Sequence, residues 1–185
     1  GSFKGGASVT LRSGLLGFFQ INPEVFEMVI RDMAPYLDGE HVVEFFAGVG
    51  AITIAAAAGG GGPKSAILVE IEGEAVQFAR QNIELNGLQG RFEARISLAR
   101  KMRDEIEPET VAVFDPPRSG LDPRTLKRLM EVRPKRVVYL SCNVATQAND
   151  LSELLPCYRV EFARLYNFFP RTPHIESLIV LERAR

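Results

Sequence analysis

Residues 41–70 read HVVEFFAGVGAITIAAAAGGGGPKSAILVE, and this stretch decides the fold class. The two short apolar runs at 41–46 and 65–70 predict buried strands, and the alanine-rich segment 51–58 predicts a helix between them. The glycines in the turn at 47–50 let the backbone pass close to a ligand, and the helix that follows offers free N–H groups. This alternation of strand, turn, helix and strand is typical of the start of a parallel sheet.

The rest of the chain repeats the same alternation. We predict helices over residues 23–37, 74–86, 98–105 and 123–130 and from residue 145, and strands over 91–95, 111–114, 136–140, 157–166 and 175–182. No helix separates the last two strands, so we expect an antiparallel C-terminal strand in an otherwise mostly parallel sheet. The sequence therefore predicts one doubly wound α/β domain with helices on both faces, without an internal repeat.

Composition excludes several classes of protein. The chain has 185 residues, of which 46% are hydrophobic and 24% charged, which is typical of a globular domain and not of a disordered or collagen-like chain. Its longest apolar run, 52–58, is far shorter than the ~20 residues of a membrane span. Cys142 and Cys157 form no CxxC pair, so a zinc ribbon or disulfide scaffold is not expected, and Cys157 is expected in the core.

Charge is distributed unevenly along the chain. The formal net charge is -1, but residues 1–90 carry 5 Lys and Arg against 10 Asp and Glu, whereas residues 91–185 carry 17 against 13. Residues 118–136 are the most basic stretch, with only two acids, Asp122 and Glu131. Two interpretations stay open for this stretch: a partial footprint for phosphates, or a solvated helix face with its loop.

Ligands of such a sheet bind at the carboxyl ends of the strands, so the residues after each strand are the candidates for function. Glu70 ends the second strand 20 residues past Gly50, where a carboxylate can accept hydrogen bonds from both hydroxyls of a ribose. Ala51-Ile52-Thr53 follows Gly50, so the third glycine of the dinucleotide fingerprint is absent. Together with the acidic Glu44 in the first strand, these features suit S-adenosylmethionine.

Three further motifs follow later strands. Asp115-Pro116-Pro117-Arg118-Ser119-Gly120 is a rigid, extended loop because two prolines restrict it. Cys142 stands between a strand and a helix N-terminus, where the helix dipole is expected to stabilise a thiolate; it is either a nucleophile or a buried, inert cysteine. The constrained loop at residues 169–176 delivers His174, which is expected to be structural, and Glu176.

Taken together, these motifs resemble those of the RNA 5-methyluridine methyltransferase family in order and spacing. The residues that carry the resemblance are 18–22 (FFQIN), 46–50 (FAGVG), 69–70 (VE), 82–87 (NIELNG), 115–120 (DPPRSG), 141–143 (SCN) and 169–176 (FPRTPHIE). The resemblance covers residues 18–185 and implies a Rossmann-like class I methyltransferase domain. Residues 1–17 are then a lead-in that begins with Gly1-Ser2, which looks like the remnant of a cleaved tag.

The resemblance also implies a reaction and a site. Carbon 5 of uracil is a poor nucleophile until a thiolate adds to carbon 6, and a base must later remove the proton on carbon 5. The family pattern assigns the nucleophile to Cys142 and the base to Glu176. It assigns the S-adenosylmethionine site to Gln20, Phe46, Gly48, Glu70 and Asp115. No metal is expected, the partner is RNA (tRNA or rRNA), and the expected compartment is the cytoplasm.

The chain also departs from the usual family pattern. Ala47, Ala51 and Ile96 occupy places where family members commonly carry other residues near the cofactor, and Val144 replaces a proline. Two other classes therefore stay open: a methyltransferase acting on an exocyclic nitrogen, and a non-catalytic RNA-binding or scaffold protein with the same fold. Family members also carry RNA-binding segments, which we expect to lie outside this sequence. Arg118 and Arg171 are candidates for contacts with RNA phosphates.

Overall fold

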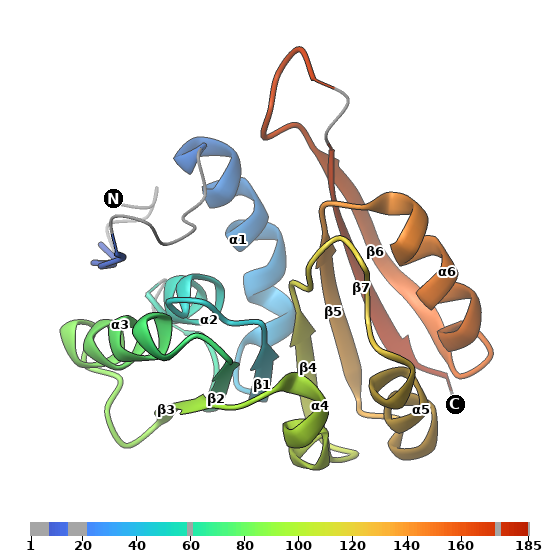
Figure 1. Cartoon of the computed structure of the whole chain (residues 1–185), viewed down its shortest axis with the longest axis horizontal. Coiled ribbons are helices and arrows are strands. Elements are labelled where there is room, and N and C mark those ends of the chain that lie inside the picture. Colours follow the sequence, from blue (N-terminus) through green and yellow to red (C-terminus); the bar gives the residue numbers. More distant parts are fainter. Residues whose placement is uncertain (1–7, 15–21, 59–60, 173–174, 185) are drawn as a thin grey trace.

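The computed structural model of the chain describes residues 8–14, 22–58, 61–172 and 175–184. Within these residues the centre of the fold is one seven-stranded sheet (Figure 1). Its strands are β1 (His41–Phe45), β2 (Ser65–Glu70), β3 (Phe92–Ile96), β4 (Thr110–Phe114), β5 (Arg136–Ser141), β6 (Tyr158–Tyr166) and β7 (Glu176–Arg183). Each predicted strand is present, with bounds within one residue of those expected from the sequence.

The helices also follow the prediction, with one difference. They are α1 (Pro23–Leu37), α2 (Ala51–Ala57), α3 (Gly73–Leu85), α4 (Ala99–Met102), α5 (Pro123–Val132) and α6 (Val144–Leu154). The helix expected over 98–105 is instead the short α4 followed by a 3₁₀ turn, η1 (Arg103–Glu105). No side chain caps the start of α4, and the fully buried Ile106 draws the chain into the core directly after η1. No helix among the described residues is long and apolar enough to cross a membrane.

The order of the strands places a crevice at their carboxyl ends. The sheet order is β3-β2-β1-β4-β5-β7-β6, and the five strands β1 to β5 run parallel. The last strand, β7, lies between β5 and β6 and runs antiparallel to both, as predicted. The chain winds outward from β1 to β3 and then returns to β4 on the other side of β1. Ligands of doubly wound sheets bind at this reversal point.

Side chains that alternate along the strands form two hydrophobic layers. Val42 of β1 faces the layer that contains α1, α2 and α3, and its neighbour Val43 faces the layer that contains α5 and α6. In the second layer the rings of Phe45 and Phe114 stack with their centroids 4.9 Å apart. Both rings are fully buried at the last residues of β1 and β4, so they support the backbone from which the site loops depart.

Most of the basic stretch at residues 118–136 serves the fold. Arg128 donates to the carbonyl oxygens of Arg103 (3.3 Å) and Ile106 (3.0 Å), and so fastens η1 to α5. Lys135 pairs with Glu40, and Arg136 donates to Glu182 of β7 at 2.5 Å. The interpretation as a solvated face with structural contacts is therefore favoured over a continuous phosphate footprint.

The N-terminal lead-in also packs on the domain. Val9 is buried within the layer formed by α1, α2 and α3, and Leu11 packs against the same layer. Residues 8–14 are thus in contact with the folded core, whereas the division of the chain between residues 17 and 18 stays a prediction.

Candidate active site

The turn after β1 contains three residues with positive φ angles, two of which are glycines. Phe46, Gly48 and Gly50 have φ angles of +60°, +54° and +79°. A Cβ atom on Gly50 would lie 2.8 Å from the terminal carbons of Ile54 and Leu68, which are buried, whereas a Cβ on Gly48 would meet open space. Gly50 therefore packs the turn onto the core, and Gly48 presents bare backbone to the crevice.

Glu70 holds this turn against the end of β2. Its Oε2 accepts a hydrogen bond from the N–H of Gly48 at 2.9 Å. Its Oε1 accepts from the N–H groups of Ile71 and Glu72, at 2.6 and 3.0 Å. A carboxylate has about four acceptor positions, so Oε2 keeps capacity for a hydroxyl group of a ligand.

A cavity of about 660 Å³ opens at the carboxyl ends of the strands. It is lined by six of the seven residues predicted for the site: Phe46, Gly48, Glu70, Asp115, Cys142 and Glu176. The seventh, Gln20, lies outside the described residues, as does His174. The structure thus brings together residues that are up to 130 positions apart in the sequence.

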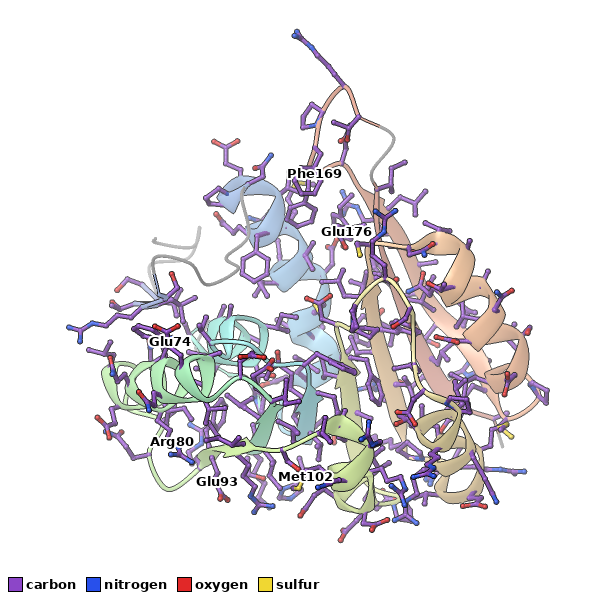
Figure 2. The ribbon with its side chains drawn as sticks, in the orientation of Figure 1. Glu74, Arg80, Glu93, Met102, Phe169 and Glu176 are labelled. Carbon is purple, nitrogen blue, oxygen red and sulfur yellow. The ribbon has the colours of Figure 1, made fainter. Side chains whose placement is uncertain are left out.

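Sequence reasoning missed one wall of this cavity. Glu72, Glu74, Ala75 and Phe78, at and after the start of α3, line it opposite the catalytic candidates, together with Gly14. Figure 2 labels Glu74 on the α3 side and Glu176 on the β7 side. The alternation of acids at positions 70, 72 and 74 was the available signal, because it follows a strand at the ligand-binding edge.

The pairing of β5 with β7 places the two catalytic candidates side by side. Ser141 and Ser177 are opposite each other in the antiparallel ladder, so the next residues outward are Cys142 and Glu176. The buried Gln147 of α6 donates to the carbonyl oxygens of Tyr139 (3.0 Å) and Ser177 (3.2 Å), and so holds these strand ends together.

The surroundings of Cys142 oppose the thiolate that the helix N-terminus is expected to stabilise. Burial raises the pKa of the Cys142 thiol, and the carboxyl groups of Glu176 and Asp115 raise it further. The N-terminus of α6 is satisfied by Asn143, whose Oδ1 accepts from the N–H of Ala145 at 3.2 Å. Arg118 acts in the opposite direction, because its positive charge favours the thiolate.

The acids around this cysteine are also perturbed. Burial raises the pKa of Asp115 to about 8, with Glu176 and Glu44 adding to the shift. Burial likewise raises the pKa of Glu176, and that of Glu44 to about 7. Asp115 and Glu44 therefore exchange protons near neutral pH, as acid and base groups in enzyme sites do.

The proline loop after β4 is fixed to α6 behind the cavity. The carbonyl oxygen of Arg118 accepts from Asn143 Nδ2 (2.9 Å) and from Thr146 Oγ1 (3.2 Å). Asp150 Oδ2 accepts from the N–H of Leu121 at 2.9 Å and from the hydroxyl of Tyr139 at 2.7 Å. The loop is thus fixed at Arg118 and at Leu121, so the cavity wall it forms is preorganised.

The sheet order, the glycine turn after β1 and the acid that ends β2 define a Rossmann-like class I methyltransferase domain. The family model for tRNA (uracil-5-)-methyltransferases matches residues 17–184, and the chain belongs to this family. The resemblance inferred from the motifs is therefore confirmed.

Individual relatives and solved structures agree with this assignment. The chain is 30% identical over 176 residues to an uncharacterised RNA methyltransferase of Mycoplasma mobile, covering 95% of this chain and 48% of that protein. It is 34% identical over 172 residues to one from Listeria monocytogenes, covering 89% of this chain and 37% of that protein. The chain thus spans about half or less of the length of these relatives.

The crystal structure of a Pyrococcus abyssi tRNA (uracil-54, C5)-methyltransferase in complex with S-adenosyl-L-homocysteine is similar to this chain. The TM-score is 0.80 and the identity 31%, over 90% of this chain and 40% of that one. The M. capricolum TrmK structure has a TM-score of 0.65 at 14% identity, over 85% of this chain and 68% of that one, and shows the shared fold alone.

Proposed function

We propose that this chain transfers a methyl group from S-adenosylmethionine to carbon 5 of a uridine in structured RNA, through a covalent adduct with Cys142. The observation that carries the proposal is that Cys142 and Glu176 line the same cavity as the glycine turn and Glu70. One cavity therefore unites a nucleophile, a base and a place for a nucleoside.

The cavity fits the cofactor. Its volume of about 660 Å³ lies within the range of pockets for small molecules and cofactors. Gly48 presents open backbone, and Glu70 Oε2 keeps an acceptor for a ribose hydroxyl. When bound, S-adenosylmethionine supplies an electrophilic methyl group on a positively charged sulfur. Glu72 and Glu74 also line this space, so their carboxylates favour a cationic ligand.

The chain's own residues divide the remaining chemistry. The Cys142 thiol loses its proton to solvent, and the resulting thiolate adds to carbon 6 of the uracil, which places negative charge on the carbon 5 side of the ring. After the methyl group has been received at carbon 5, Glu176 removes the remaining proton there, the double bond between carbons 5 and 6 re-forms, and Cys142 leaves as a thiolate. The raised pKa of Glu176 suits this role, because a base with a higher pKa holds the abstracted proton more readily.

RNA is the proposed partner. Carbon 6 is reached by Cys142 only if the uridine leaves its base stack, so a loop or an extruded base is the expected form of the substrate. Arg118 is exposed beside Cys142, and Arg171 is exposed in the β6–β7 connection, which extends past the strand ends (Figure 1). Both are proposed to contact phosphates. The family name and the Pyrococcus protein favour tRNA over rRNA, and hence the cytoplasm.

The test is methyl transfer followed by nucleoside analysis. The protein is incubated with S-adenosylmethionine carrying a labelled methyl group and with unmodified tRNA or rRNA transcripts, and the RNA is digested to nucleosides. We expect labelled 5-methyluridine from the wild type and from Cys157→Ala, the matched cysteine control, and none from Cys142→Ala. Label on an exocyclic nitrogen would favour the alternative methyltransferase, and cofactor binding without any labelled RNA would favour the scaffold.

A further inference from the structure

Residues 8–14 form an extended segment, here called the strap, which lies along α3. Val9 anchors it in the hydrophobic core, where its side chain is buried. Gly14 at its other end lines the cavity: a Cβ there would lie 3.2 Å from Glu74 Oε1 and 3.3 Å from the ring of Phe78. The strap therefore runs from the core to the wall of the proposed cofactor site.

Asn82 of α3 and Asn86, the C-cap residue of the same helix, bind the backbone of the strap. Asn86 Oδ1 accepts from the N–H of Thr10 at 3.1 Å, and Asn86 Nδ2 donates to the carbonyl oxygen of Thr10 at 2.8 Å. Asn82 Oδ1 accepts from the N–H of Arg12 at 2.7 Å, and Asn82 Nδ2 donates to the carbonyl oxygen of Arg12 at 3.0 Å. Each side-chain amide thus pairs with the strap as the backbone of a neighbouring β-strand would, through one donated and one accepted hydrogen bond.

Asn82 makes one contact that Asn86 lacks. Its Nδ2 also donates to the carbonyl oxygen of Val49, in the glycine turn, at 3.0 Å. One hydrogen of this amide therefore holds the strap and the other holds the turn. Asn82 is fully buried, so a displacement of either partner would leave a buried donor without an acceptor.

We propose that Asn82 is a positioning residue that couples the strap to the glycine turn, so that the two walls of the cofactor cavity adopt their binding geometry together. The inference rests on the proposed function, because the ligand of the cavity is the nucleoside cofactor. Asn82 is not among the residues that line the cavity. It acts through its hydrogen bonds to the carbonyl oxygens of Arg12 in the strap and Val49 in the turn. By linkage, a ligand that fixes the turn must also order the strap.

The first experiment measures the affinity for S-adenosylhomocysteine by calorimetry. Asn82→Ala removes the coupling from the helix side, and Val9→Asp removes it from the strap side by placing a charge in the core. We expect each substitution to weaken binding of S-adenosylhomocysteine about tenfold, because one or two buried hydrogen bonds are lost. Gln89→Ala, beyond the C-terminal end of α3 and without a contact to the strap, should bind like the wild type.

A double variant distinguishes coupling between Asn82 and the strap from independent structural damage by the two substitutions. If Asn82 acts through the strap, the double variant Val9→Asp/Asn82→Ala binds no more than a few-fold weaker than Asn82→Ala alone. Independent effects would multiply to about a hundredfold. If Asn82→Ala does not fold, Asn86→Ala takes its place, because it releases the strap and leaves the glycine turn untouched. Variants that retain wild-type affinity overturn the proposal.

Hydrogen exchange at the N–H of Thr10 provides the second readout. This group is bound by Asn86, at a distance from the cavity, and it reports whether the strap is ordered. We expect S-adenosylhomocysteine to slow its exchange in the wild type and to have no effect on it in Asn82→Ala. An equal slowing in both proteins overturns the coupling. A wild type that does not bind the ligand at all refutes the proposed function instead, and the two failures are thereby distinguished.

Discussion

Glu44 offers a direct test of how the glycine turn is supported. This acid lies on β1 with 1% of its surface exposed, and its Oε2 accepts from the N–H of Thr53 in α2 at 3.2 Å. Burial raises its pKa from 4.5 to about 7; the nearby Glu70 adds to the shift, and the contact with Thr53 opposes it. The hydroxyl oxygen of Thr53 is buried without a hydrogen-bond partner in the described part of the chain.

The size and sign of the effect on stability follow from this shift. A pKa that is higher in the folded protein than in the unfolded chain stabilises the fold at low pH. For Glu44 that contribution is complete below about pH 4.5 and is lost as the pH rises through about 7. At 1.36 kcal/mol per pKa unit, ionised Glu44 costs the folded state roughly 3 kcal/mol at pH 8. Glu44→Gln keeps an oxygen for Thr53 and carries no charge.

Urea denaturation at pH 5 and pH 8 measures this difference. We expect the free energy of unfolding of the wild type to fall by roughly 2.5 kcal/mol more than that of Glu44→Gln between these values. Asp115 changes with pH in the same direction and is present in both proteins, so only the smallest part of its shift, which comes from Glu44, differs between them. Glu153→Gln, an exposed acid on α6, should follow the wild type. Equal pH dependence of the wild type and Glu44→Gln would refute the reasoning.

Three further predictions concern the cavity. The pH midpoint for alkylation of Cys142 by iodoacetamide should lie above the ordinary pKa of a thiol. Glu176→Gln should lower this midpoint, because a neighbouring negative charge is removed. Identical midpoints in the two proteins would contradict the expected effect of Glu176. Gly50→Ala should destabilise the fold by roughly 3 kcal/mol in urea titrations, because of backbone strain at φ +79° and overpacking of the added Cβ. Gly48→Ala should cost only about 1 kcal/mol of stability, yet impair cofactor binding more than that loss explains. Equal losses of stability in the two variants would be contrary evidence. Asp150→Ala should lower the free energy of unfolding by about 3 kcal/mol, because the hydroxyl of Tyr139 and the N–H of Leu121 lose their acceptor. Asp150→Asn should lower it by less than half as much, because an acceptor oxygen remains. Thermal melts in which the two variants coincide would show that Asp150 does not hold the loop through these hydrogen bonds.

The sequence predicted the fold because its signals are local. The apolar runs, the cap at Asn22 before Pro23 and the glycine turn each act within a few residues, and the structure places strands and helices accordingly. The site was predictable for a related reason. Ligands bind at the carboxyl ends of parallel strands, so Glu70, Asp115 and Cys142 had to lie at one edge once the strands were assigned.

Features that depend on distant partners were not predictable. The clamp of Asn82 on the strap joins residues 70 positions apart, and nothing near Asn82 in the sequence indicates it. The contacts of the basic stretch depend on carbonyl oxygens in and just after η1 and on the acids Glu40 and Glu182. The rise in the pKa of Cys142 was not predictable, because the sequence shows the helix that follows but not the burial of the sulfur or the carboxyl groups brought beside it by β4 and β7.

The most direct test of the central claim is to trap the adduct. The protein is incubated with S-adenosylmethionine and an RNA in which 5-fluorouridine replaces uridine, because fluorine on carbon 5 is not removed as a proton and the cysteine cannot be released. We predict a covalent protein–RNA complex that survives denaturing electrophoresis, maps by mass spectrometry to the peptide of Cys142, and is lost in Cys142→Ala but not in Cys157→Ala. Methyl transfer to uridine RNA without any adduct at Cys142 would contradict the proposed mechanism.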